Sequence, residues 1–341
     1  GSLAMADGEA ANAVPPAPPK DPAVSREVSP TSPLLDGIDD GGEGEDRMAL
    51  YDVGKAVGKG GYSIVYRGVY KVDGRVVAIK KIEIFDMTPK KRERCLQEVQ
   101  LLQSLKHTNI ITMLDSFISD NQLIIVFEWA MGGDLKRLLR RAREAETPLD
   151  EAVVWAHFLQ IADALRYMHS SRVMHRDIKP ANVLITGGGL LKLGDLGLGR
   201  HFSPQTQEAF SKVGTPYYVS PEVVQGTGYD WKSDIWSLGC LLYELAALQS
   251  PFEIEGANLY SVFRKISQGE YEPLARDRFS EALVKLVHQM LQTDPEKRPS
   301  AEDVFQVARK VCEQQARASG DVFVMAEVLH DRLVVLGRHA G

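Results

Sequence analysis

Four polar residues near the middle of the chain have the types and the spacing needed to act on a phosphate group. They are Asp177, Lys179, Asn182 and Asp195. Short apolar runs lie on both sides of the glycines at 187–189, which predicts a β-hairpin with these side chains at its ends. Two carboxylates, a carboxamide and an ammonium suit a magnesium ion and a hydroxyl group that must lose its proton, the chemistry of phosphoryl transfer. Any one of these four residues alone could be a solvated loop residue, but all four in this order predict a phosphoryl-transfer site.

A glycine-rich stretch at residues 58–65 could hold a phosphate through its backbone. Glycine lets backbone N–H groups approach phosphate oxygens closely. Most such turns are only hairpins, so this stretch alone is weak evidence. Here the sequence Val-Ala-Ile-Lys follows, with Lys80 placed 15 residues after Val65, and the two motifs together indicate a nucleotide site.

The elements that must position these residues follow from hydrophobic periodicity. Strands are expected at 52–57, 64–69, 76–82, 113–118 and 123–128, with one helix at 89–105. Long helices are expected at 134–143, 151–169, 233–247, 259–268 and 281–291. The chain is therefore predicted to be α+β and to have two lobes. The small lobe, residues 50–130, would be an antiparallel five-stranded sheet with one helix, and the larger lobe, residues 131–309, would be helical.

The composition restricts the class of protein. Hydrophobic residues make up 44% and charged residues 25%, as in ordinary globular domains, and the net charge of −6 argues against nucleic-acid binding as the main task. Three scattered cysteines indicate neither a disulfide framework nor a zinc site, and they favour the cytosol or nucleus. No signal segment opens the sequence, and its most apolar helix, 235–248, is too short to span a bilayer. We therefore expect neither a nucleic-acid partner nor membrane insertion.

The two ends differ in composition from the middle of the chain. Residues 1–49 are rich in proline, glycine and acidic groups, so we expect a disordered tail that cannot bury enough apolar surface to offset its ordering entropy. Ser29 and Ser32 precede prolines and are either phosphorylation sites or plain tail residues. Residues 310–341 are expected to form a helical extension, which either packs on the larger lobe or docks a partner.

The motifs together resemble those of eukaryotic protein kinases. The pattern H-R-D-x-K-x-x-N begins at His175, D-L-G begins at Asp195, and G-T-P-Y-Y-V-S-P-E ends at Glu222. The lysine in the first pattern is the form found in serine/threonine kinases. The resemblance covers about residues 51–309 and implies a bilobal protein-kinase fold. It also implies ATP and Mg²⁺ as cofactors and proteins with Ser or Thr hydroxyls as substrates.

By this resemblance, Lys80 would bind the α- and β-phosphates of ATP. A buried ammonium needs an anion beside it, and Glu98 is the preferred candidate, with Glu93 as the alternative. Lys81 is the next strand residue and should face the other way. Ser63 stands where the family has its third glycine, which we expect to tune nucleotide affinity without abolishing binding.

The resemblance places the adenine at the segment that joins the two lobes. Phe127 would guard the back of the pocket, and backbone groups of residues 128–130 would bind the adenine edge. Asp134 would cap the following helix and could also contact the ribose. The complete set of expected ATP contacts is Gly58, Lys59, Gly60, Gly61, Tyr62, Ser63, Val65, Ala78, Lys80, Phe127, Glu128, Ala130 and Asp134.

The resemblance also implies the roles of the central motif. Asp177 would accept or orient the proton of the substrate hydroxyl, and Lys179 would neutralise charge on the γ-phosphoryl group. Asn182 and Asp195 would hold magnesium. Positioning and charge stabilisation dominate such a reaction. Leu196 replaces the usual phenylalanine and still offers an apolar side chain, so we expect activity to survive.

A polar segment after Asp195 corresponds to the activation loop of kinases. Ser211 is the expected activating phosphorylation site, whereas Thr215 is expected to be a structural contact. A phosphate on Ser211 could pair with Arg176 and Arg200 and order the loop; otherwise these hydroxyls only solvate it.

Two further contacts are expected to hold the larger lobe together. Glu222 should pair with Arg298, and Asp234 should accept hydrogen bonds from the catalytic loop. Both roles are structural.

Finer features are similar to the NIMA-related (Nek) serine/threonine kinases, in the stretches 175–183, 193–200, 214–222 and 233–252. The short stretch after residue 309 is similar to the short single-domain subgroup of that family. The resemblance implies cell-cycle, microtubule or cilium control, an upstream activating kinase, and a place in the cytoplasm, on the cytoskeleton, centrosome or flagellum, or in the nucleus. The alternative is a kinase-fold scaffold, but Lys80, Asp177 and Asp195, whose loss would indicate one, are all present.

Overall fold

The structure is a computed structural model of the chain. It describes residues 47–60, 63–195, 216–254, 256 and 258–319. All of these residues belong to one compact unit. Most of the predicted tail and the final part of the predicted extension therefore lie outside the described residues.

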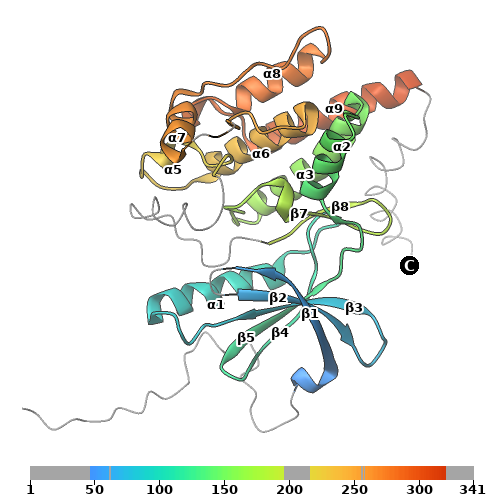
Figure 1. Ribbon diagram of the computed structural model, residues 1–341, viewed down its shortest axis with the longest axis vertical. Coiled ribbons are helices and arrows are strands. Elements are labelled where there is room, and N and C mark those ends of the chain that lie inside the picture. The colour runs from blue at the N-terminus through green and yellow to red at the C-terminus, as the bar shows by residue number, and fades with distance from the viewer. Residues whose placement is uncertain (1–46, 61–62, 196–215, 255, 257, 320–341) are drawn as a thin grey trace, which may run out of the picture. The chain divides into compact units, whose positions relative to one another are not determined.

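An antiparallel sheet of five strands and one helix form the first lobe (Figure 1), as the sequence predicted. The strand order is β1-β2-β3-β5-β4. The elements are η2 (Arg47–Leu50), β1 (Tyr51–Lys59), β2 (Ser63–Tyr70), β3 (Val76–Ile82), α1 (Pro89–Ser104), β4 (Met113–Ser119) and β5 (Gln122–Glu128). Residues 47–49 were expected to belong to the disordered tail, but they form the start of η2, where Arg47 pairs with Asp115 and lies over the Phe117 ring.

The alternation of side chains along β3 decides which of them face α1. Ile82 is buried together with Cys95 and Val99 of α1, whereas Val77 and Ile79 are buried in a cluster on the opposite face of the sheet. Successive strand residues point to opposite faces, so Lys80 shares the α1 side with Ile82. The alternation of side chains along β3 therefore decides that the Lys80 side chain lies on the α1 side of the sheet.

The second lobe is mainly helical, again as predicted, and a small three-stranded sheet, β6-β7-β8, adjoins its helices (Figure 1). The first elements are β6 (Gly133–Asp134), α2 (Leu135–Glu144), α3 (Glu151–Ser170), η3 (Pro180–Asn182), β7 (Val183–Ile185) and β8 (Leu191–Leu193). The later elements are α5 (Pro221–Val224), α6 (Trp231–Ala247), α7 (Leu259–Gln268), α8 (Glu281–Met290), η4 (Pro295–Lys297) and α9 (Ala301–Ser319).

Helix α6 is the centre of this lobe. Almost all of its residues are buried, and it contacts both α3 and α8. A capping box formed by Asp230 and Ser233 starts the helix at Trp231, two residues earlier than expected. Gly239 allows α8 to approach, because a Cβ there would lie 2.8 Å from the Cβ of Met290.

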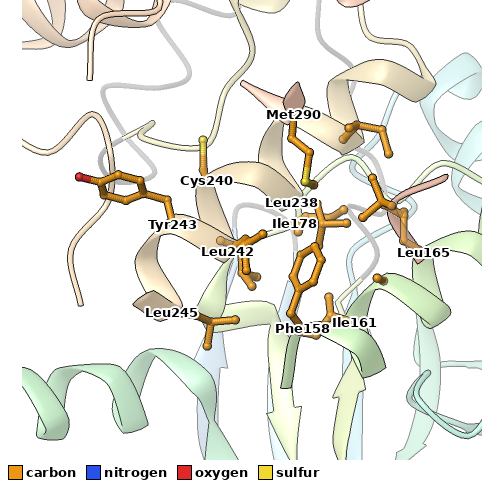
Figure 2. Close-up of a cluster of buried hydrophobic side chains, with 14 of the residues drawn as sticks. Phe158, Ile161, Leu165, Ile178, Leu238, Cys240, Leu242, Tyr243, Leu245 and Met290 are labelled. Carbon is orange, nitrogen blue, oxygen red and sulfur yellow. The ribbon is translucent and has the colours of Figure 1, made fainter. Parts of the chain in front are cut away.

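The core of the second lobe also holds the catalytic loop in place. Figure 2 shows Ile178 among side chains of α3, α6 and α8. The side chain of Ile178 is only 1% exposed, although it lies between the polar residues Asp177 and Lys179. Burying one apolar side chain in the middle of the motif anchors both polar neighbours. The labelled members of this core are Phe158, Ile161, Leu165, Ile178, Leu238, Cys240, Leu242, Tyr243, Leu245 and Met290.

Helix α9 crosses the expected boundary between residues 309 and 310. It is continuous from Ala301 to Ser319 and packs along α3, with Ala308 and Cys312 fully buried. The chain therefore has no structural break at that boundary. Within the described ranges, no helix combines the length and the hydropathy that a membrane span requires.

Candidate active site

The loop between α3 and β7 brings three of the predicted residues together. The Lys179 Nζ and the Asn182 Nδ2 each donate to the Oδ2 of Asp177, both at 2.8 Å. The same amide nitrogen donates to the Asp177 backbone carbonyl at 2.7 Å. The 3-10 turn η3 makes this possible, because it folds residues 180–182 back toward Asp177. The carboxylate is therefore held in one orientation by two side chains of its own loop.

His175 joins this loop to the segment that carries Asp195. The backbone N–H of Asp177 donates to its Nδ1 at 3.2 Å, so its Nε2 carries the proton and donates to the Gly194 carbonyl at 3.1 Å. The ring is 1% exposed, and burial lowers the pKa of His175 below its usual value despite the nearby carboxylates. Neutral imidazole fits this bridge because one nitrogen accepts and the other donates.

Asp234 at the start of α6 supports the loop from the core, as the sequence predicted. It accepts the backbone N–H groups of His175 and Arg176, both at 2.9 Å. His169 donates to it at 2.9 Å, and the Tyr229 hydroxyl donates as well. Burial raises the pKa of Asp234, but these partners outweigh burial and hold the pKa below its usual value. Arg176 has a positive φ of 67°, and Asp234 fixes the backbone at that residue.

The predicted ion pair between Lys80 and Glu98 is not present in this structure. The Lys80 ammonium contacts the Oδ1 of Asp195 at 2.6 Å, and Glu98 accepts from the Arg176 Nη1 at 2.9 Å. Among the ion pairs of the described residues, none joins Lys80 to Glu98. The alternative partner, Glu93, is exposed. The physical reason is competition. Lys80 and Glu98 could pair with each other within the first lobe, but each lies in contact with an opposite charge of the second lobe, Asp195 or Arg176.

The glycine-rich turn joins β1 to β2 beside Lys80. In the sheet register Gly58 lies opposite Val65, and Val65 lies opposite Lys80. The Gly60 N–H donates to the Ser63 carbonyl at 2.7 Å, and a Cβ at Gly60 would lie 2.9 Å from the Ser63 hydroxyl oxygen. A side chain at position 60 would therefore displace the Ser63 hydroxyl group. Lys59 lies at the end of β1, whereas Gly61 and Tyr62 are outside the described residues.

Lys81 faces away from this site, as expected from strand alternation. Its ammonium lies 5.7 Å from the centre of the Tyr66 ring.

The segment between the lobes contains the other predicted nucleotide contacts. Ala78 lies opposite Phe127 in the sheet, and Phe127 lines a small pocket together with Lys80 and Asp195. Asp134 accepts from the Arg137 N–H at 2.8 Å and caps α2, as predicted. The contacts of residues 127–130 and of Asp134 with ATP stay predictions.

Lys192 is a residue of this region that the sequence analysis missed. Its Nζ donates to the Oε1 of Glu128 at 2.8 Å, and the same oxygen accepts the Thr112 N–H at 2.7 Å. Burial raises the pKa of Glu128, but these donors outweigh burial and hold the pKa below its usual value. The pair ties the segment between the lobes to β8. A lysine in the middle of the short apolar strand Leu191–Leu193 was the available signal.

The predicted contact between Glu222 and Arg298 is confirmed. Two guanidinium nitrogens of Arg298 each lie 2.8 Å from a carboxylate oxygen of Glu222. Of the regulatory residues, Ser211, Thr215 and Arg200 are outside the described residues, as is Leu196. The pairing of Arg176 and Arg200 with a phosphate on Ser211 stays a prediction, because Ser211 and Arg200 lie outside the described residues. Arg176 contacts Glu98 in this structure.

Comparison with known proteins agrees with this geometry. The family model described as "Protein kinase domain" matches residues 51–308. The chain is 38% identical over 263 residues to "Probable serine/threonine-protein kinase nek2" of Dictyostelium discoideum, covering 76% of this chain and 62% of the relative. It is 39% identical over 259 residues to human "Serine/threonine-protein kinase Nek5", covering 76% and 36%, and 37% identical over 281 residues to mouse "Serine/threonine-protein kinase Nek2", covering 80% and 63%.

The chain spans less than two thirds of the length of each of these relatives. The residues matched by the family model, 51–308, contain the glycine-rich stretch, Lys80, the loop from His175 to Asn182, Asp195 and the pair Glu222 and Arg298. The chain therefore belongs to the protein kinase domain family, and its kinase domain is NIMA-related.

Proposed function

We propose that this protein transfers the γ-phosphoryl group of ATP to serine or threonine hydroxyls of other proteins. The observation that carries the proposal is the Asp177 carboxylate, which Lys179 and Asn182 hold from its own loop. Kinase-family membership supports ATP and protein substrates in general.

The residues around Asp177 fit the acceptor side of this reaction. The carboxylate would accept or orient the proton of the incoming hydroxyl, because it is a hydrogen-bond acceptor that its loop holds fixed. Lys179 would neutralise charge on the transferred group while it remains close to Asp177. Catalysis would then come from positioning and charge stabilisation, with little covalent help from the protein.

Asn182 and Asp195 fit a magnesium ion. Asn182 uses its amide nitrogen on Asp177, which directs its carbonyl oxygen elsewhere, and the Asp195 side chain is 58% exposed. Mg²⁺ prefers oxygen ligands and usually takes one or two from the protein and the rest from phosphate and water. No group of three or more His, Cys, Asp or Glu residues in the described part of the chain could hold a metal alone. The bound ion would neutralise phosphate charge, and Lys80 would bind the phosphates beside it.

Phosphate transfer from radiolabelled ATP to a Ser-containing protein tests the proposal. We expect magnesium-dependent transfer by the wild type and a loss of at least about 100-fold in Asp177→Asn, because general-base and orienting groups contribute roughly 10²–10⁴-fold. Asparagine keeps an oxygen that accepts from Lys179 and Asn182, so the loop should keep its shape. Asp150→Asn is the matched control, because Asp150 is exposed and its side chain makes no cap hydrogen bond.

Equal activity in the wild type and Asp177→Asn would contradict the proposal. Silence of both, also after phosphorylation of Ser211 by an upstream kinase and despite measurable ATP binding, would instead favour a scaffold function.

A further inference from the structure

Helix α2 carries an unusual concentration of positive charge for a chain with a net charge of −6. Of its ten residues five are basic and one is acidic, and all five basic side chains are exposed. They form two rows on the helix surface, because residues four and three positions apart share a face. The first row is Lys136, Arg140 and Arg143, and the second row is Arg137 and Arg141.

The buried face of α2 places these rows at the edge of the catalytic loop. Leu135 and Leu139 are buried, and the helix contacts η3, which contains the predicted magnesium ligand Asn182. The helix also begins directly at its cap, Asp134, at the end of the segment between the lobes. The basic rows therefore lie on the exposed faces of a helix that packs against the catalytic loop.

Two members of the first row lie near the segment that ends at Glu222. Arg143 pairs with Glu253 at 2.9 Å, and Lys136 and Arg143 both lie close enough to act on the carboxyl group of Glu244. Glu244 in turn accepts from the hydroxyl of Tyr218, which lies in residues 216–222, the described part of the G-T-P-Y-Y-V-S-P-E motif. The first row thus lies beside the carboxyl group to which this motif is bonded.

The carboxylates on this surface leave positive charge uncompensated. Glu253 is taken by Arg143, and Arg140 pairs weakly with Glu144 at 3.6 Å. Burial raises the pKa of Glu244 to about 7, so this group carries only part of a negative charge at neutral pH. Lys136 has no ion pair among the described residues. Its exposed ammonium is the cation that this surface leaves open.

We infer that the first row of α2, with Lys136 at its head, is a specificity-determining surface for protein substrates. It binds a carboxylate of an acidic residue that lies a few positions from the phosphorylated Ser or Thr. This inference rests on the proposed function, because it assigns a substrate class to the same site. The argument is charge complementarity. Glu253 supplies an anion to Arg143 and Glu144 supplies one to Arg140, and an aspartate or glutamate of the substrate would supply one to Lys136.

The test compares Lys136→Glu with Arg137→Glu. The two residues are adjacent in the first turn of α2 but lie on different rows, and the substitutions change the charge equally. A glutamate in the first turn is favourable for a helix, so both variants should fold. The substrates are Ser-containing peptides in which one position at a time is either Asp or Asn.

We expect the wild type to prefer Asp over Asn at one position or more by about two- to five-fold in kcat/KM, the size of one exposed ion pair. The preference should disappear or reverse in Lys136→Glu and persist in Arg137→Glu. Absence of an acidic preference in the wild type, or equal loss in the two variants, would overturn the inference.

Binding of the same labelled peptides, followed by fluorescence anisotropy, separates this inference from the proposed function. Selective binding of Asp peptides that depends on Lys136, without phosphate transfer even after phosphorylation of Ser211 by an upstream kinase, would refute the proposed function and support the inference about the first row. Phosphate transfer without a preference for Asp peptides would refute the inference about the first row and leave the proposed function standing.

Discussion

At the scale of single residues, the site depends on side chains whose protonation state is set by burial. His175 can bridge the Asp177 N–H and the Gly194 carbonyl only while one ring nitrogen is unprotonated. Protonation would replace an acceptor by a donor that faces another donor, inside a core that disfavours charge. The ring therefore couples the geometry of the catalytic loop to pH.

Stability should fall as the pH is lowered from 7 to 5, in part because of His175. The folded-state pKa of His175 lies below its usual value of about 6.5, so the unfolded chain binds more protons in this window. The contribution is fully present above about pH 6.5 and is lost as the pH falls through the folded-state pKa. Thermal unfolding between pH 5 and 8 measures it. His175→Gln should flatten the dependence and the control His288→Gln, at an exposed position, should not. Parallel curves for the wild type and His175→Gln would contradict this assignment.

At the scale of elements, the second lobe is tied together by one buried ion pair. Glu222 lies on α5 and Arg298 follows η4, and the pair meets at the start of α6, where Ser233 also donates to Glu222. The Arg298 side chain is 0% exposed and lies 5.0 Å from the centre of the Trp236 ring. The guanidinium further donates to the carbonyls of Gln292, Lys232 and Thr293, so one side chain organises three segments.

Arg298→Met should lower the free energy of unfolding by about 3–5 kcal/mol, because it leaves the buried carboxylate of Glu222 without its cation. Urea denaturation at neutral pH measures the change. Arg309→Met is the matched control, since Arg309 pairs with Glu313 at 2.9 Å on the surface, where a loss of at most about 1 kcal/mol is expected. Similar losses for the two variants would show that burial does not distinguish these pairs.

At the scale of the whole kinase domain, backbone and side-chain contacts join the two lobes around the site. A β-bridge joins Ile110 to Leu193. The ion pairs between the described parts of the lobes are Lys80 with Asp195, Glu98 with Arg176, Glu128 with Lys192, and His107 with Asp163. Asp195 has a positive φ of 45°, so its backbone is held in a sparsely populated region where Lys80 can reach the carboxylate. A bound nucleotide and magnesium ion would compete for these same charges.

Magnesium should therefore add to the thermal stabilisation by ATP, and this addition should depend on Asp195. A ligand at about 100 times its Kd stabilises the folded state by roughly 2.7 kcal/mol. Thermal unfolding with ATP and either Mg²⁺ or EDTA measures the difference. We expect Asp195→Asn to lose the magnesium-dependent part and Asp150→Asn to keep it; an undiminished magnesium effect in Asp195→Asn would exclude Asp195 as a ligand.

The sequence alone determined those features that depend on neighbours along the chain. Strand alternation directed Lys80 and Lys81 to opposite faces, and the spacing of Asp177, Lys179 and Asn182 within a single loop sufficed to bring them together. Asp134 was recognised as a helix cap for the same reason, because a cap bonds to backbone only three residues away.

Only the tertiary structure decided which charges pair across the cleft. Lys80 and Asp195 are 115 residues apart, and Lys192 and Glu128 are 64 apart, so their contacts depend on how the two lobes meet. Glu98 was a sound candidate for Lys80 by residue type, but Coulomb attraction does not distinguish between cations of equal charge. The distance to each cation does distinguish between them, and tertiary packing sets the distances between segments that are remote in sequence.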